Sequence, residues 1–100
     1  LAGIPAPSFP DTETTFAELR ARIEKTLDFI QSVDASAIDS GAERTIELKF
    51  PQGGFSFKGA DYAFGWVAPN LYFHMTTFYA ILRHNGLALE KADYLHGLQQ

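Results

Sequence analysis

Hydrophobic and polar residues follow two different periods along this chain. Between residues 11 and 33 the apolar side chains recur every three or four positions, which predicts an amphipathic helix with a stripe of Phe16, Leu19, Ile23, Leu27 and Ile30. Between residues 44 and 58 the period becomes two on either side of Gln52-Gly53-Gly54, whose positive-φ positions suit a β-hairpin turn. The apolar face of that hairpin consists of Ile46, Leu48, Phe50, Phe55 and Phe57.

Local signals mark where the first helix begins. Thr15 followed by Glu18 fits a capping box, and Asp11 or Thr12 could cap an earlier start. Glu18 and Arg22 are also spaced as an i,i+4 ion pair, which indicates a solvated face of the helix.

The stretch from Gly59 to Gly86 is strongly aromatic and holds the only Trp and the only Met of the chain. We expect a first helical piece over residues 60–67 and an interruption near Pro69, which cannot continue the backbone hydrogen-bond pattern. A second piece is expected to run to about His84, where Asn85-Gly86 stops it. Apolar side chains lie on more than one face of this stretch, so other elements must cover it.

The remaining segments are predicted to be irregular or short. Three prolines in residues 1–10 favour an extended lead-in. Residues 34–43 form a connector with one buried turn at Ala37-Ile38, and residues 91–95 form a short turn before a frayed tail at 96–100. One hundred residues fit a single domain. The fold class is therefore mainly α: two long helices, the second kinked near Pro69, plus the hairpin.

The predicted elements are too few to bury the apolar residues they carry. We expect the stripe of the first helix to pack on the helix at 69–84, yet this leaves part of the aromatic set uncovered. Partner helices must come from the same parent protein or from a second subunit in a homodimer. Leu1 in place of Met, and no helix or strand pattern in the opening residues, also predict a fragment or a processed form of a longer protein.

Charge and composition narrow the classes of partner. The net charge is −4 and the eight basic residues are scattered, which argues against a nucleic-acid groove or an anionic membrane surface. An uninterrupted apolar run of about 18 residues, as a membrane span needs, does not occur. The absence of Cys rules out disulfides and Cys nucleophiles and is compatible with a cytoplasmic location.

Two pieces of the second helix carry a resemblance to a known family. PNLYFH at residues 69–74 and YAILRHNG at residues 79–86, together with the hairpin, GADYAFGWVAPN and PAPSFPDTETTFAELRARIEKTLDFI, resemble an uncharacterised domain-of-unknown-function family from bacteria and fungi. That family is placed in the DinB/YfiT-like four-helix-bundle superfamily. The resemblance implies an up-down helix bundle with about two further helices before residue 1, so residues 1–100 would be its C-terminal part.

The superfamily also implies a metal site that this chain does not reproduce. It includes thiol-dependent transferases and isomerases whose divalent metal is held by three His, two of them at i and i+4 on the last long helix. Only His74 matches that pair, because the position four residues on is Phe78. His84 lies about 15 Å farther along a continuous helix, too far to share a metal with His74. We therefore expect no cofactor and no metal site within this chain; a divalent metal would need ligands supplied before Leu1.

The candidate site residues lie on the second helix. Asn70, His74 and Thr77 can share one face, where a His oriented by a neighbouring amide could act as a base or a metal ligand. The alternative is a buried His satisfied by hydrogen bonds between helices. Trp66 and Tyr79 could line a pocket for an aromatic ligand, and the alternative is core packing; Tyr72, Phe73 and Phe78 belong to the same set.

Two function classes remain open. The first is a non-catalytic or metal-site-degenerate module that binds a small-molecule ligand or dimerises. The second is a DinB-like metal- or thiol-dependent transferase or isomerase that uses His74. Whether the protein is an enzyme is not decided by its sequence.

Overall fold

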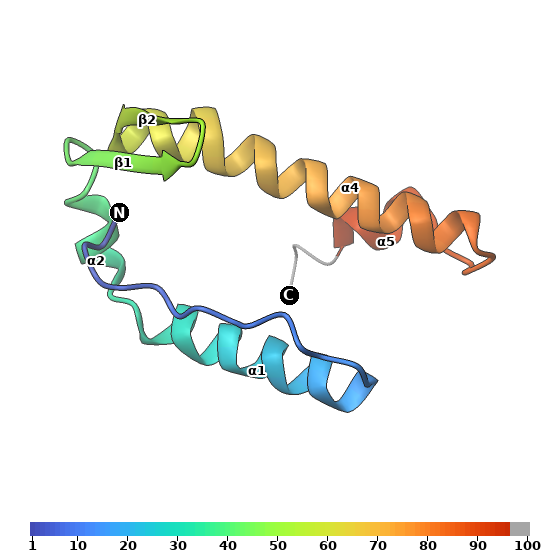
Figure 1. Ribbon diagram of the computed structural model, residues 1–100. Helices are drawn as coiled ribbons and strands as arrows, with labels where there is room; N and C mark the ends of the chain where they lie inside the picture. The colour runs from blue at the N-terminus through green and yellow to red at the C-terminus, as the bar shows by residue number, and fades with distance from the viewer. Residues whose placement is uncertain (97–100) are drawn as a thin grey trace. The chain divides into compact units, whose positions relative to one another are not determined.

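The computed structural model describes residues 1–96 and is mainly helical with one antiparallel hairpin, as predicted (Figure 1). The chain divides into two compact units, residues 1–62 and the part that begins at Ala63, and each is described by itself. The first unit holds α1 (Phe16–Ser32), α2 (Ala35–Asp39), β1 (Thr45–Phe50), β2 (Gly53–Lys58) and α3 (Gly59–Asp61). The second holds nearly all of η1 (Tyr62–Val67), followed by α4 (Ala68–His84) and α5 (Lys91–His96). Except for His96, the predicted frayed tail lies outside the described residues.

Helix α1 begins with the predicted capping box. The Glu18 N–H donates to Thr15 Oγ1 at 3.2 Å, and Glu18 Oε2 accepts from the backbone N–H groups of Thr14 and Thr15 at 2.8 and 2.9 Å. These two backbone hydrogen bonds lower the pKa of Glu18. The stabilisation by this carboxylate is therefore present above its unfolded-state pKa and lost as the pH falls through the folded one. The earlier start capped by Asp11 or Thr12 is wrong, because α1 begins at Phe16 and Thr15 is its N-cap.

Replacing Thr15 with Ala is expected to reduce the free energy of unfolding by about 1 kcal/mol, because the first turn loses its side-chain acceptor. Urea denaturation at a fixed protein concentration measures this difference. Thr14→Ala is the control: the Thr14 hydroxyl donates to Glu18 Oε2 but accepts no helix N–H in the box. Equal losses in the two variants would contradict the capping role of Thr15.

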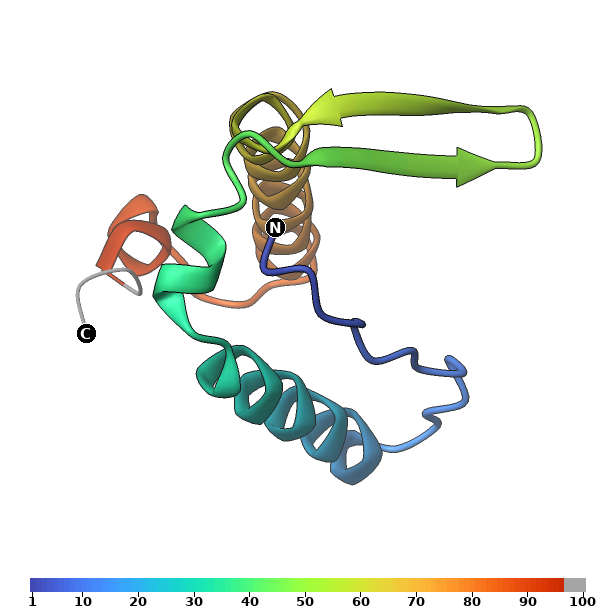
Figure 2. The same cartoon turned by 90° about the vertical axis from the view of Figure 1, so that its left-hand side faces the viewer.

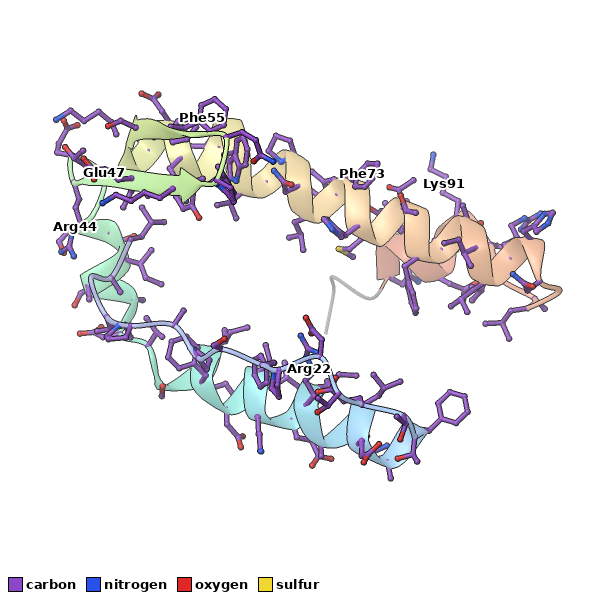
Figure 3. The ribbon with its side chains drawn as sticks, viewed as in Figure 1. Arg22, Arg44, Glu47, Phe55, Phe73 and Lys91 are labelled. Carbon is purple, nitrogen blue, oxygen red and sulfur yellow. The ribbon has the colours of Figure 1, made fainter. Side chains whose placement is uncertain are left out.

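The extended lead-in runs back along α1 and is held there by Arg22 (Figures 1 and 3). Arg22 Nη1 lies 2.5 Å from Asp11 Oδ1 and 3.0 Å from Glu13 Oε2, and its guanidinium carbon is 4.8 Å from the centre of the Phe9 ring. The hydrogen bond to Asp11, followed by that to Glu13, raises the pKa of Arg22. The predicted pair of Glu18 with Arg22 is therefore wrong, since the cap holds Glu18 and the lead-in holds Arg22.

The hairpin forms over the predicted residues (Figure 2). Ile46 lies opposite Phe57 and Leu48 opposite Phe55, which places the predicted apolar residues on one face. The turn between Phe50 and Gly53 consists of two residues, and Gly53 alone of the three expected positions has a positive φ, 138°. Edge-on contact of the Phe50 and Phe55 rings, 6.1 Å between centroids, extends this face to the end of the hairpin.

Backbone packing joins α2 to the end of the hairpin. Gly41 and Gly59 are buried, and the Ala60 N–H donates to the Ala42 carbonyl at 2.9 Å. A Cβ built on Gly59 would lie 1.9 Å from the Gly41 carbonyl oxygen. The backbone at Gly41 therefore lies too close to residue 59 for that residue to carry a side chain. The predicted turn at Ala37-Ile38 is helical but not buried, since Ile38 is 40% exposed.

The central stretch is helical from Gly59 to His84 but changes type within it. Residues 62–67, most of the predicted first helical piece, form a π-helix, and the α-helical pattern resumes at Ala68 with Pro69 in its first turn. Pro69 has no N–H to donate to the turn before it, so a regular α-helix cannot pass through unchanged. The helix ends as predicted: Gly86 has a φ of 94°, and the Leu87 N–H donates to the Leu82 carbonyl at 3.1 Å.

Among the residues that the structure describes, no hydrophobic residue is buried. The stripe of α1 is between 46% exposed at Leu19 and 91% exposed at Phe16. The expected packing of the stripe on the 69–84 helix stays a prediction. None of the described helices combines the length and apolarity that crossing a lipid bilayer requires.

Candidate functional site on helix α4

Asn70, His74 and Thr77 lie on one exposed face of α4. At about 100° per residue, their positions fall within roughly 60° of one another around the helix axis. All three side chains are exposed. The alternative of a His74 buried by hydrogen bonds between helices stays a prediction. The face is available to a ligand or a partner.

A backbone carbonyl orients the His74 ring. Nδ1 lies 2.7 Å from the Asn70 carbonyl oxygen, an acceptor only, so the neutral ring carries its proton on Nδ1 and a lone pair on Nε2. The side-chain amide that was expected to hold His74 instead donates from Asn70 Nδ2 to the Trp66 carbonyl at 2.7 Å. The edge contact of Phe73 with His74, 5.4 Å between ring centroids, further restrains the ring; Figure 3 marks the position of Phe73.

Tyr79 does not lie beside His74. Tyr79 lies about 140° from His74 around the helix. Its hydroxyl donates to the Leu89 carbonyl at 3.5 Å, and its ring meets Tyr94 edge-on at 6.2 Å. Arg83 donates to the same carbonyl. Tyr79 therefore connects α4 to the segment that leads into α5.

The residues around His74 do not complete a metal site. Within residues 1–96, no group of three or more His, Cys, Asp or Glu side chains is placed to hold a metal ion. Phe78 lies one turn after His74, where a second ligand on this face would stand. The chemistry that the described residues offer at this site is therefore that of one imidazole beside the uncharged side chains of Asn70 and Thr77.

An open depression that sequence reasoning missed lies where α4 ends and α5 begins. Its lining includes Arg83, Leu87, Glu90 and Asp93. The Glu90 N–H donates to Asp93 Oδ2 at 2.7 Å, which starts α5. In a capping box the side chain three residues after the N-cap accepts a hydrogen bond from the N-cap backbone N–H, and Asp93 does this for Glu90. The spacing of these two residues could have indicated the start of α5. The depression carries one basic and two acidic side chains and no aromatic ring, so it does not continue the His74 face.

Comparison with known proteins places the chain in a family. Residues 1–95 match the family described as a domain of unknown function, DUF1993. The chain is also similar to the crystal structure, at 1.83 Å resolution, of a DinB family member protein from Shewanella denitrificans, with a TM-score of 0.76 and 43% identity. That match covers 90% of this chain and 50% of the other, so the chain spans about half the length of the solved protein. No curated protein matches. The chain therefore belongs to the DUF1993 family and is DinB-like, as its PNLYFH and YAILRHNG pieces indicated.

Proposed function

We propose that this chain is the C-terminal part of a DinB-like helix bundle, and that it is a non-catalytic, metal-site-degenerate module which binds a partner helix or an apolar ligand. One observation carries the proposal: the apolar faces of α1 and α4 are exposed, with no buried hydrophobic residue among those described. Helices with such faces are stable only when something covers them.

Two kinds of partner could bury the exposed apolar faces of this module. Further helices of a longer protein would complete a bundle, in keeping with a solved relative about twice as long. A second copy of the chain would do the same through a symmetric interface. The lack of Cys agrees with a cytoplasmic location for either form.

Chelated protein titrated with Zn²⁺, Ni²⁺ or Mn²⁺ is expected to show no stoichiometric binding that depends on His74. The reason is that Phe78 replaces the ligand one turn on, and a lone imidazole binds divalent ions weakly. Isothermal titration calorimetry measures this. His74→Ala is the matched variant, and His84→Ala and His96→Ala test the other imidazoles. One equivalent of metal bound by the parent chain and lost in His74→Ala would contradict the proposal, whether or not the other two variants also lose it.

The second candidate is a metal- or thiol-dependent transferase or isomerase that uses His74. It is supported by the ring orientation: an Nδ1–H held by a backbone carbonyl leaves Nε2 to bind a metal or accept a proton. The additional ligands would have to come from residues outside this chain. Metal tightly bound by a longer protein and released in its His74→Ala variant would favour this candidate over the first.

A further inference from the structure

The residue pair that ends α4 is chemically labile. Asn85 is followed by Gly86, and this Asn-Gly pair occurs once in the chain. The other asparagine, Asn70, is followed by Leu71. In an Asn-Gly pair the backbone nitrogen of the glycine can attack Cγ of the asparagine with little hindrance, because glycine has no Cβ. Asparagine is for this reason among the thermolabile residues of proteins.

The reaction at such a pair needs water and no other reactant. The Gly86 nitrogen forms a bond to Asn85 Cγ, and the bond from Cγ to Nδ2 breaks. Ammonia leaves with the proton of the Gly86 nitrogen, and a five-membered succinimide ring remains. Water then opens the ring at either carbonyl. One opening gives Asp at position 85, and the other gives isoAsp, in which the main chain runs through Cγ.

The backbone at Asn85 is far from the geometry of ring closure. Closure requires the Gly86 nitrogen to lie beside Cβ of Asn85 when viewed along the Cα–C bond. The ψ of Asn85 is 9°, so the Gly86 nitrogen is nearly eclipsed with the backbone nitrogen of Asn85 instead. Cβ is another substituent of the same tetrahedral carbon, and closure therefore requires a rotation of roughly 120° about this bond.

Two hydrogen bonds of the helix end resist that rotation. The Gly86 N–H donates to the Arg83 carbonyl at 3.0 Å, which engages the proton that the nucleophile must lose. Asn85 Nδ2 donates to the Ile81 carbonyl at 2.8 Å, which holds the leaving amide back against the last turn. Both contacts lie within residues 81–86, so they do not depend on what else packs on α4.

We propose that Asn85 is a site of spontaneous deamidation, that local opening of the last turn of α4 sets its rate, and that conversion loosens the segment leading into α5. An Asp side chain cannot donate to the Ile81 carbonyl, and it adds a negative charge where the helix carbonyls already carry partial negative charge. The isoAsp product lengthens the main chain by one carbon. Either product weakens the stop that precedes Leu89, whose carbonyl accepts from Tyr79 and Arg83. This inference does not depend on whether the module is catalytic.

Peptide mapping after incubation in mildly alkaline buffer, with and without urea, measures the rate at Asn85. Tryptic peptide 84–91 carries Asn85, and peptide 59–83 carries Asn70 as the internal control. Conversion of Asn85 is expected to be slower in the folded chain on the order of tenfold to 100-fold, because two hydrogen bonds of ordinary strength must open first. Both Asp and isoAsp should appear, and Asn70 should stay intact. Equal rates in the two buffers, or Asp as the sole product, would overturn the proposal.

Two alanine-to-glycine variants test whether the opening is local. Ala80→Gly removes a good helix former near the end of α4 and is expected to raise the folded-state rate at Asn85 about fivefold. Ala21→Gly is the matched control, since Ala21 is an exposed residue within α1 and the substitution is the same. Its rate should equal that of the parent chain. An equal rise in both variants would show that global unfolding gates the reaction and would overturn local opening.

Hydrogen exchange tests the effect of the product. In Asn85→Asp the Leu87 amide, which donates to the Leu82 carbonyl in the parent, is expected to exchange about fivefold faster. The amides of β1 serve as the reference and should exchange at the parent rate. Unchanged exchange at Leu87 would overturn the loosening of this segment.

Discussion

At micromolar concentration the isolated 100-residue chain is expected not to be a monodisperse monomer of 11.1 kDa. The reason is the exposed apolar area of α1 and α4. Burial of a Leu or Phe side chain contributes about 1.5–3 kcal/mol, and Phe16, Ile23 and Phe78 are among those at least 59% exposed. Leaving several such side chains exposed loses stabilisation comparable to the whole free energy of unfolding of a typical domain, about 5–15 kcal/mol.

Multi-angle light scattering and thermal melting check this expectation together. Association should appear as a mass above that of one chain, and melting should depend on protein concentration. A monodisperse 11.1 kDa species that melts cooperatively at the same temperature over a tenfold range of concentration would contradict it. In that case the apolar faces would be covered within one chain.

Gly59→Ala is expected to destabilise the first unit by about 2–3 kcal/mol, the cost of a forced overpacking. The added Cβ would meet the Gly41 carbonyl oxygen at 1.9 Å and the Gly41 carbonyl carbon at 2.9 Å. Both are backbone atoms, so relief requires a shift of α2 or of the strand end. That shift would also break the hydrogen bond from Ala60 to Ala42. Urea denaturation at a fixed chain concentration measures the loss.

Gly65→Ala is the matched control for this substitution. Gly65 is also helical, but a Cβ built on it meets nothing within 4 Å. Its free energy of unfolding should stay the same or rise by about 0.5–1 kcal/mol, because Ala restricts the unfolded chain more than Gly does. If Gly59→Ala were as stable as Gly65→Ala, the close backbone approach at Gly41 would be wrong.

Sequence alone determined the features that depend on residues a few positions apart. The Thr15 and Glu18 capping box, the hairpin with its apolar face and the stop of α4 before Gly86 were all predicted and are confirmed. Each is set by a short-range rule: a cap spans three residues, a strand alternates with period two, and a positive φ favours glycine. The same holds for the family, because continuous pieces of α4 carry its motif.

The tertiary structure decided which groups meet from farther away. Arg22 had a suitable partner one turn back in Glu18, yet it binds Asp11 and Glu13 because the lead-in folds back along α1. The close approach of Gly59 to Gly41 likewise depends on where α2 and the hairpin end. Asn70 could have oriented His74 with its amide, but at the end of the π-helix that amide donates to the Trp66 carbonyl, and the Asn70 carbonyl orients the ring instead. The periodicity of a sequence predicts on which face of an element a side chain lies. The partner of that side chain depends on which competing groups the fold brings close to it. The sequence pattern does not contain this information.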